Sequence, residues 1–202
     1  IQAYGQKTVI VVEPDEGIDI GALNSAISSA ADPGNTIFEL RRGGLYLLNG
    51  SVSHSGYTLH IRAEEGDGPR PVLQPAVDEQ GNSSRHFNPG GSLTLEGLYL
   101  QGRSELGSID SQPIRVSGAE SHIIIDNCFI DYAGQSIVRT NSSGNSVFIT
   151  NSIIRNSILP TDPANGRVID TRGNPQNILS IENSTIYNNG SRIFRPDGAA
   201  IN

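Results

Sequence analysis

The stretch SVFITNSIIRN (146–156) decides the fold, because its pattern recurs along the chain. The shared pattern is an aliphatic residue, any residue, an aliphatic residue, a polar residue, an Asn, two further residues and an aliphatic residue. Three other stretches follow it: SLTLEGLYLQG (92–102), HIIIDNCFIDY (122–132) and NILSIENSTIYNN (177–189). Counted from Leu95, the second aliphatic position recurs after 30, 24 and 32 residues, a spacing typical of stacked repeats.

Alternation of apolar and other residues within each copy predicts β-strands and not helices. A short strand, an Asn and a second short strand cannot bury an apolar face alone. Stacking one copy on the next buries that face, and backbone hydrogen bonds then run from coil to coil as a parallel ladder. An antiparallel sandwich is the alternative, but two-residue Asn-Gly hairpins are missing between these strands. We therefore predict an all-β parallel β-helix.

One asparagine position is shared by three of the four copies. Asn127, Asn151 and Asn183 occupy it, and Gly97 takes the same place in the earliest copy. Asn tolerates the left-handed backbone conformation, and its amide can hydrogen-bond to the backbone or to a stacked amide. The pattern predicts a buried structural ladder of these three residues at a corner between two sheets.

Coils of this kind resemble the right-handed parallel β-helix of the pectin-lyase-like superfamily, which includes the chondroitinase-B-like polysaccharide lyases. The resemblance covers residues 18–198 and implies a right-handed single-stranded parallel β-helix with an N-terminal capping helix. The superfamily also contains hydrolases, adhesins and non-enzymatic modules. The resemblance is therefore specific for the fold and not for an activity.

The N-terminal part of the sequence differs from the coils. Ile20, Leu23 and Ile27 have helical spacing and predict a short amphipathic helix that covers the first coil. The apolar strand TVIVV (8–12) precedes the repeats and belongs to none of them. These features divide the chain into an N-terminal strand and linker (1–17) and a β-helix domain (18–202), with the cap at 18–34 and the coils at 35–202.

Composition limits the classes of partner and the cellular location. The net charge of −7 and the pI near 5.0 argue against a nucleic-acid partner. No run of 18 apolar residues exists, so we expect no membrane span. Cys128 is the sole cysteine and excludes an internal disulfide. The chain begins with Ile1 and holds no Met, which fits a processed end or an excised domain. A cleaved signal peptide is the simpler interpretation and predicts an extracellular or cell-surface protein.

A third strand in each coil carries the candidate binding residues. The strands are QPIRVSG (112–118), QSIVRTN (135–141), GRVIDTR (166–172) and SRIFRPD (191–197). Aligned, they predict an inward column of Ile114, Val138, Ile169 and Phe194. Their neighbours form one outward column of candidate substrate-binding residues: Arg115, Arg139, Asp170 and Arg195.

The resemblance implies that such a column lines a substrate groove, where guanidinium groups bind uronate carboxylates. A lyase of this kind also needs a base, usually Lys or Arg, and often calcium. This sequence has no Lys in the coils and no His in the outward column, and Asp170 alone cannot supply paired carboxylates. An arginine–aspartate ladder on a solvated face, without a ligand, is the simpler interpretation, and carbohydrate binding and a lyase site are the alternatives. We predict no catalytic residue.

No cofactor or metal ion is predicted from the residue spacing. Glu64, Glu65 and Asp67 form an acidic turn that leaves calcium as an open alternative, although their spacing matches no known calcium loop. A solvated turn is the simpler interpretation of these carboxylates.

The two ends of the coil stack suggest the leading functional prediction. The pattern runs through SRIFRPDG (191–198) without a closing helix, and TVIVV is suited to pair with a neighbour's exposed edge. The sequence therefore predicts an extracellular structural module that self-associates end to end into a homo-oligomer or filament and contacts acidic polysaccharide. The alternative is a polysaccharide lyase or carbohydrate-binding module that acts on uronate-containing glycans through an arginine-lined groove.

Overall fold

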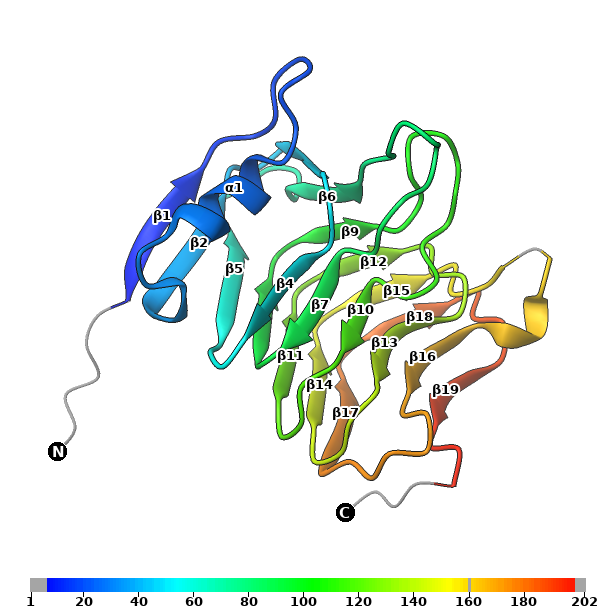
Figure 1. The fold of residues 1–202 in the computed structure, drawn as a ribbon. Helices are drawn as coiled ribbons and strands as arrows, with labels where there is room; N and C mark the ends of the chain where they lie inside the picture. Colours follow the sequence, from blue (N-terminus) through cyan, green and yellow to red (C-terminus); the bar gives the residue numbers. More distant parts are fainter. Residues whose placement is uncertain (1–6, 160, 199–202) are drawn as a thin grey trace, which may run out of the picture.

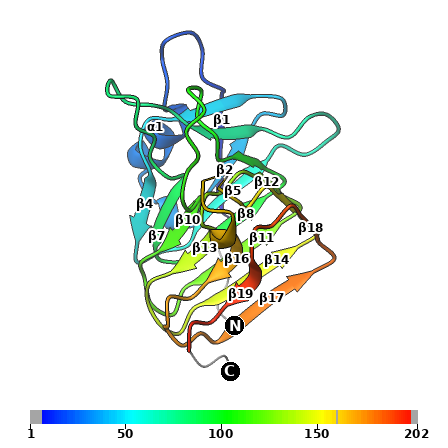
Figure 2. The ribbon, with the colours of Figure 1, turned by 90° about the vertical axis from the view of Figure 1, so that its right-hand side faces the viewer.

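The computed structural model describes residues 7–159 and 161–198, which form a solenoid of stacked parallel coils (Figures 1 and 2). Three parallel sheets make up its sides. Sheet 1 contains β1 (Thr8–Val12), β2 (Thr36–Leu40), β5 (Leu59–Ala63), β8 (Leu93–Glu96), β11 (His122–Asp126), β14 (Ser146–Thr150) and β17 (Ile178–Glu182).

The other two sheets have six strands each. Sheet 2 contains β3 (Leu45–Leu48), β6 (Val72–Pro75), β9 (Tyr99–Gln101), β12 (Phe129–Asp131), β15 (Ile153–Arg155) and β18 (Thr185–Tyr187). Sheet 3 contains β4 (Val52–Ser55), β7 (Phe87–Gly90), β10 (Ile114–Val116), β13 (Ser136–Thr140), β16 (Arg167–Asp170) and β19 (Arg192–Arg195). From β2 onward the chain passes through sheets 1, 2 and 3 in turn, which confirms the predicted parallel β-helix.

The core is a column of aliphatic side chains that follows the predicted register. Leu95, Ile125, Ile149 and Ile181 are successive partners in sheet 1, and the first three are fully buried. Because neighbouring parallel strands lie about 4.8 Å apart, each of these side chains packs on its equivalent in the next coil. The period-2 alternation therefore fixes which side chains enter the core.

At the corner between sheets 1 and 2, the prediction of a buried asparagine ladder is wrong. Asn127, Asn151 and Asn183 do follow strands that pair in register, and their φ angles are 49°, 51° and 48°. All three side chains are nevertheless exposed. The Asn151 amide donates to Oδ1 of Asp126 at 2.8 Å and not to another corner asparagine. These residues are used for their backbone conformation, and they do not form a buried ladder of amides.

The buried ladder lies one residue later along the chain. The backbone N–H of Cys128 donates to Oγ of Ser152 at 3.0 Å, and the N–H of Ser152 donates to Oγ of Ser184 at 3.1 Å. These N–H groups are shielded from water at the corner, so each needs a hydrogen-bond acceptor from the protein. Serine supplies that partner with a side chain small enough for the core.

A capping helix covers the core at the N-terminal end of the solenoid (Figure 1). The helix α1 (Ala22–Ser29) buries Leu23 and Ile27, and the carboxylate of Asp15 accepts a hydrogen bond from the Ala22 N–H at its first turn. Ile20 lies before the helix and is exposed, so it does not join the predicted apolar face. Two short 3-10 helices, η1 (Pro33–Asn35) and η2 (Pro163–Asn165), complete the helical elements of the described residues.

The sequence predicts that the strand TVIVV pairs with a neighbouring molecule, but in the structure it pairs within its own chain. It forms β1 and pairs with β2 of the same chain through all five of its residues, from Thr8 with Thr36 to Val12 with Leu40. Burial of Val12 and the hydrogen bond from the Tyr46 hydroxyl to the Val12 carbonyl, at 2.7 Å, fix its position. β1 is therefore the first rung of sheet 1. No helix within 7–159 and 161–198 is long and apolar enough to cross a membrane.

Candidate functional site

The outer face of sheet 3 carries the predicted column of polar residues. Arg115 pairs with Arg139, Arg139 with Asp170, and Asp170 with Arg195. The inward neighbours Ile114, Val138 and Ile169 are fully buried, as predicted, so the column faces outward from the core. The structure thus brings all four predicted substrate-binding residues onto one face.

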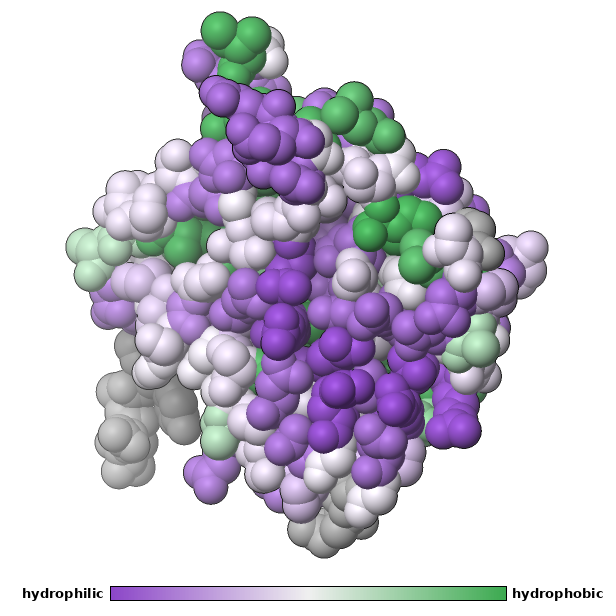
Figure 3. All heavy atoms as spheres, turned by 45° about the vertical axis from the view of Figure 1, so that its right-hand side comes forward, coloured by the Kyte–Doolittle hydropathy of each residue, from purple (hydrophilic) through white to green (hydrophobic). Residues whose placement is uncertain are grey.

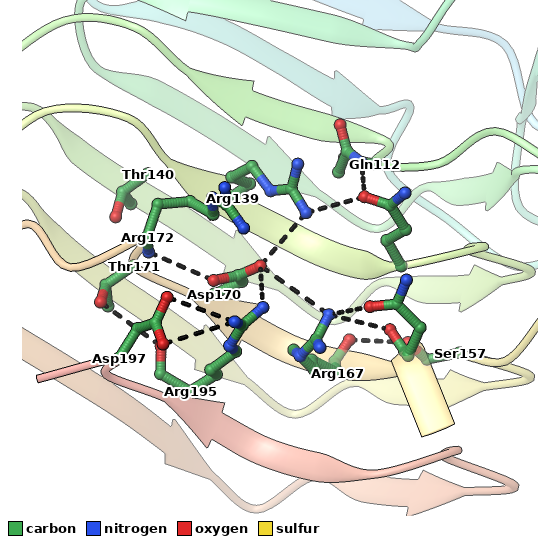
Figure 4. A network of polar contacts seen from close by, with 12 residues as sticks. Gln112, Arg139, Thr140, Ser157, Arg167, Asp170, Thr171, Arg172, Arg195 and Asp197 are labelled. Atoms are coloured by element: carbon green, nitrogen blue, oxygen red, sulfur yellow. Dashed lines mark hydrogen bonds and ion pairs between the residues drawn. The ribbon is translucent and has the colours of Figure 1, made fainter. Parts of the chain in front are cut away.

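Asp170 lies at the centre of a cluster of arginines (Figure 4). Its Oδ2 is 3.2 Å from Nη2 of Arg139, 3.7 Å from Nη1 of Arg195 and 4.0 Å from Nη1 of Arg167. The backbone N–H of Arg172 donates to Oδ1 at 3.2 Å. The Asp170 side chain has 0% exposure because these long side chains cover it, so it is not part of a solvated ladder.

Burial affects the guanidinium groups of this cluster. Desolvation lowers the pKa of Arg139, while the nearby Asp170 charge acts in the opposite direction. Desolvation also lowers the pKa of Arg167, and Arg195 adds to this effect. Both arginines keep their charge at neutral pH. Asp170 therefore offsets part of the repulsion that stacked arginines create.

A groove of about 620 Å³ lies on the same face, toward the N-terminal coils. Arg85 and Arg115 line it together with other polar residues and one glycine: Ser53, His54, Ser55, Asn88, Gly90, Ser117 and Asn141. With the amide oxygen of Asn141 turned toward Arg115, Nε of Arg115 lies 2.6 Å from that oxygen. No carboxylate lines this groove among the described residues, so its two arginines are not neutralised as Arg139 is.

Sheet 3 is positively charged although the chain as a whole is acidic. Its strands, with two flanking residues on each side, hold seven of the thirteen arginines of the chain and only two carboxylates. The arginines are Arg85, Arg115, Arg139, Arg167, Arg172, Arg192 and Arg195, and the carboxylates are Asp170 and Asp197. Figure 3 shows the most hydrophilic residues gathered in a band across this side of the molecule. We call this surface the arginine face.

Two components of the face were not predicted. Arg85 lies in the loop before β7, outside the repeat, so no periodic signal marks it. Gln135 accepts hydrogen bonds from Gln112, at 2.7 Å, and from Arg139, at 2.8 Å. His54 also lies in sheet 3, but its partner Pro89 is one residue beyond the outward column, and the His54 side chain is buried.

The acidic turn that left calcium open does not converge in the structure. Glu64 is engaged in an ion pair with Arg41, at 2.6 Å, whereas Glu65 and Asp67 are exposed. Residues 7–159 and 161–198 contain no group of three or more His, Cys, Asp or Glu side chains that could hold a metal ion.

Comparison with protein-family models, with curated proteins and with solved structures finds no match for this chain. The parallel solenoid follows from the pairing of strands in the three sheets. The superfamily suggested by the coil pattern remains an expectation from the sequence.

Proposed function

We propose that this chain is a binding module for acidic polysaccharide, and that the glycan lies along the arginine face. The observation that carries this proposal is the combination of seven arginines and an open polar groove on an otherwise acidic protein. A forked guanidinium matches the geometry of a carboxylate or sulfate, and serine and asparagine side chains suit sugar hydroxyls.

The two halves of the face have different roles in this proposal. Asp170 holds Arg139, Arg167 and Arg195 in place, and these three residues form a rigid, positively charged surface. Arg85 and Arg115 line the groove and are free of carboxylates there, so they supply the direct contacts to the ligand. Successive coils repeat about every 4.8 Å, and an extended glycan running across them meets a polar side chain at each coil.

Affinity electrophoresis or calorimetry with polygalacturonate, alginate and heparin at low salt tests the proposal. The paired substitutions Arg85→Gln and Arg115→Gln should remove most of the binding. Arg70→Gln removes a half-buried arginine that contacts Asn127 at a different corner, and it serves as the control. Loss in proportion to the charges removed, two in the paired variant and one in the control, would reduce the effect to net charge. No binding of any of the three polymers would refute the proposal.

The same polymers test the lyase alternative. Burial of Arg139 favours a base role, but Asp170 stabilises its charged form at a distance of 3.2 Å. We therefore expect binding without cleavage. An increase in the absorbance of unsaturated uronate ends during incubation would establish elimination instead.

End-to-end self-association is a second candidate function, favoured by the last coil. Phe194 continues the inward column of sheet 3 but is 36% exposed, whereas its partner Ile169 is fully buried. β1 and β17 are the terminal strands of sheet 1, so a second copy could extend this sheet in the same direction. Sedimentation at high concentration should then show oligomers that Phe194→Asp abolishes and Ile124→Asp, on the outer face of sheet 1, does not. A monomer at all concentrations would exclude this function.

A further inference from the structure

A buried histidine and a buried aspartate face each other beside the arginine face. His86 is 0% exposed and Asp110 is 6% exposed, and they lie in the loops that precede β7 and β10. Nε2 of His86 is 3.1 Å from the Leu73 carbonyl of β6. Nδ1 of His86 is 3.5 Å from Oδ2 of Asp110, and neither atom has a hydrogen-bond partner among the described residues.

This geometry requires a proton between the two side chains. A carbonyl oxygen only accepts hydrogen bonds, so Nε2 of His86 carries a hydrogen toward Leu73. Nδ1 of a neutral His86 would then be a second acceptor that faces the acceptor oxygens of Asp110. A proton on either His86 or Asp110 makes the two facing atoms attract each other across 3.5 Å. Loss of that proton leaves two buried acceptors opposite each other, which destabilises the closed arrangement.

Asp110 is the one charged group in contact with His86 among the described residues. β6 contributes no titratable side chain, and the Phe87 ring packs beside the imidazole at 6.3 Å between ring centroids. Asp78 is hydrogen-bonded to Asn82 within its own loop, and the Arg103 guanidinium lies over the Tyr132 ring. The two loops hold three further charged residues that make no ion pair with His86: Glu79, Arg85 and Glu105.

The pair is connected to the arginine face through a continuous chain of hydrogen bonds. Oδ1 of Asp110 accepts from the N–H of Gln112 at 3.0 Å. The Gln112 side chain donates to Oε1 of Gln135 at 2.7 Å, and the same oxygen accepts from Arg139 at 2.8 Å. Arg85, which lines the groove, immediately precedes His86. Contacts therefore link the pair to both halves of the arginine face.

We propose that His86 and Asp110 form a proton-linked latch that closes loops 76–86 and 102–113 and makes ligand binding on the arginine face depend on pH. The part that concerns ligand binding rests on the proposed function, whereas the latch itself does not. As the pH rises and the shared proton is lost, the loops separate, Arg85 and Gln112 lose their fixed positions, and affinity for acidic polymers falls.

Hydrogen exchange on the free protein tests the latch without a ligand. Between about pH 5 and 8, where histidine changes charge, protection of loops 76–86 and 102–113 should fall by about tenfold after correction for intrinsic exchange. The variant Asp110→Asn should keep the loops closed throughout, because its amide donates to a neutral His86 while its oxygen still accepts from Gln112. Protection that is independent of pH in the wild type, or a pH dependence that survives in Asp110→Asn, would overturn the latch.

Two histidines outside the groove supply the controls. His122→Gln removes an exposed imidazole of sheet 1, and His60→Gln removes the one that contacts Glu96 at 3.0 Å. Both variants should keep the wild-type pH dependence of loop protection. If either removes it, the proton belongs to that residue and not to the latch.

Binding of polygalacturonate at constant ionic strength tests the second half of the proposal. Wild-type affinity should fall about tenfold over the same pH range, in proportion to the loss of loop protection, and Asp110→Asn should bind equally throughout. If the loops open as expected but polygalacturonate binds equally at every pH, the link to the arginine face is wrong. If no acidic polymer binds at any pH, the proposed function fails while the exchange data still decide on the latch.

Discussion

Nη2 of Arg139 lies 3.2 Å from Oδ2 of Asp170, a carboxylate on the outer side of sheet 3 that has no exposed surface. In a parallel solenoid, residues at one register position repeat about every 4.8 Å, so a column of arginines brings like charges close together. Asp170 interrupts the column between Arg139 and Arg195 and contacts both. This one carboxylate therefore offsets repulsion among the arginines of the face.

The substitution Asp170→Asn should therefore destabilise the protein strongly. It removes the partner of three arginines and leaves Arg139, which is only 13% exposed, as a buried cation without a counter-charge. Breaking a buried pair in this way costs about 3–5 kcal/mol of the free energy of unfolding. Guanidinium chloride denaturation measures this loss.

Asp197→Asn is the matched control for this prediction. Asp197 also contacts Arg195, at 3.2 Å, but its side chain is 42% exposed. An exposed ion pair contributes at most about 1 kcal/mol, so this variant should unfold near the wild-type midpoint. If the two variants lose equal stability, Asp170 is not the centre of the cluster.

Ser152→Ala should reveal the ladder of the corner between sheets 1 and 2. The substitution leaves the Cys128 N–H buried without an acceptor and should cost about 1–3 kcal/mol of the free energy of unfolding, measured by urea denaturation. Asn151→Gly should change stability much less, because the Asn151 side chain is exposed and glycine adopts a φ of 51° without steric cost. A larger loss from Asn151→Gly would show that the amide, and not the serine, holds the corner.

The coil register could be predicted from the sequence because two signals agree. Aliphatic residues such as Ile125 and Ile149 alternate with period 2 within a strand and recur between strands, and only one stacking buries them all. The asparagine column was found for the same reason. The exposure of these asparagine side chains was not predictable, because a left-handed corner residue satisfies the pattern whether its side chain points inward or outward.

The candidate site was only partly predictable, and the missing part is not periodic. The repeat placed Arg139 and Asp170 side by side, since both belong to strands. Arg85 and the His86–Asp110 pair lie in loops of unequal length, and no spacing in the sequence relates one loop to the other. Burial of Asp170 was also missed, because it depends on how long side chains fold over a neighbour and not on strand register.

The thiol of Cys128 should make stability depend on alkaline pH. Burial raises the pKa of Cys128 to about 12 from its ordinary value of 9.0. The folded state therefore disfavours the thiolate, so this contribution to stability is complete below pH 9.0 and is lost as the pH rises toward about 12. Thermal unfolding at increasing pH should show a falling melting temperature above about pH 9, and Cys128→Ala should reduce the slope.

A thiol reagent checks the same burial in a second way. At pH 8 the folded wild type should react with a disulfide reagent only at its rate of unfolding, whereas the denatured chain should react at once. Rapid modification of the folded protein would contradict the burial of Cys128.

Removal of residues 1–12 should destabilise the protein and promote association, because β1 belongs to its own solenoid. The deletion removes all five pairs with β2 and leaves the Tyr46 hydroxyl, now bonded to the Val12 carbonyl, without that acceptor. It also uncovers the edge of β2, an unpaired strand that can pair with other chains. We expect a lower unfolding midpoint in urea and larger particles by light scattering.

The point variant Val12→Ala, which keeps the backbone pairing but removes buried methyl groups, should lower the midpoint without changing the particle size. A stable, monomeric deletion variant would instead show that β1 is dispensable for the fold and available to a neighbouring molecule.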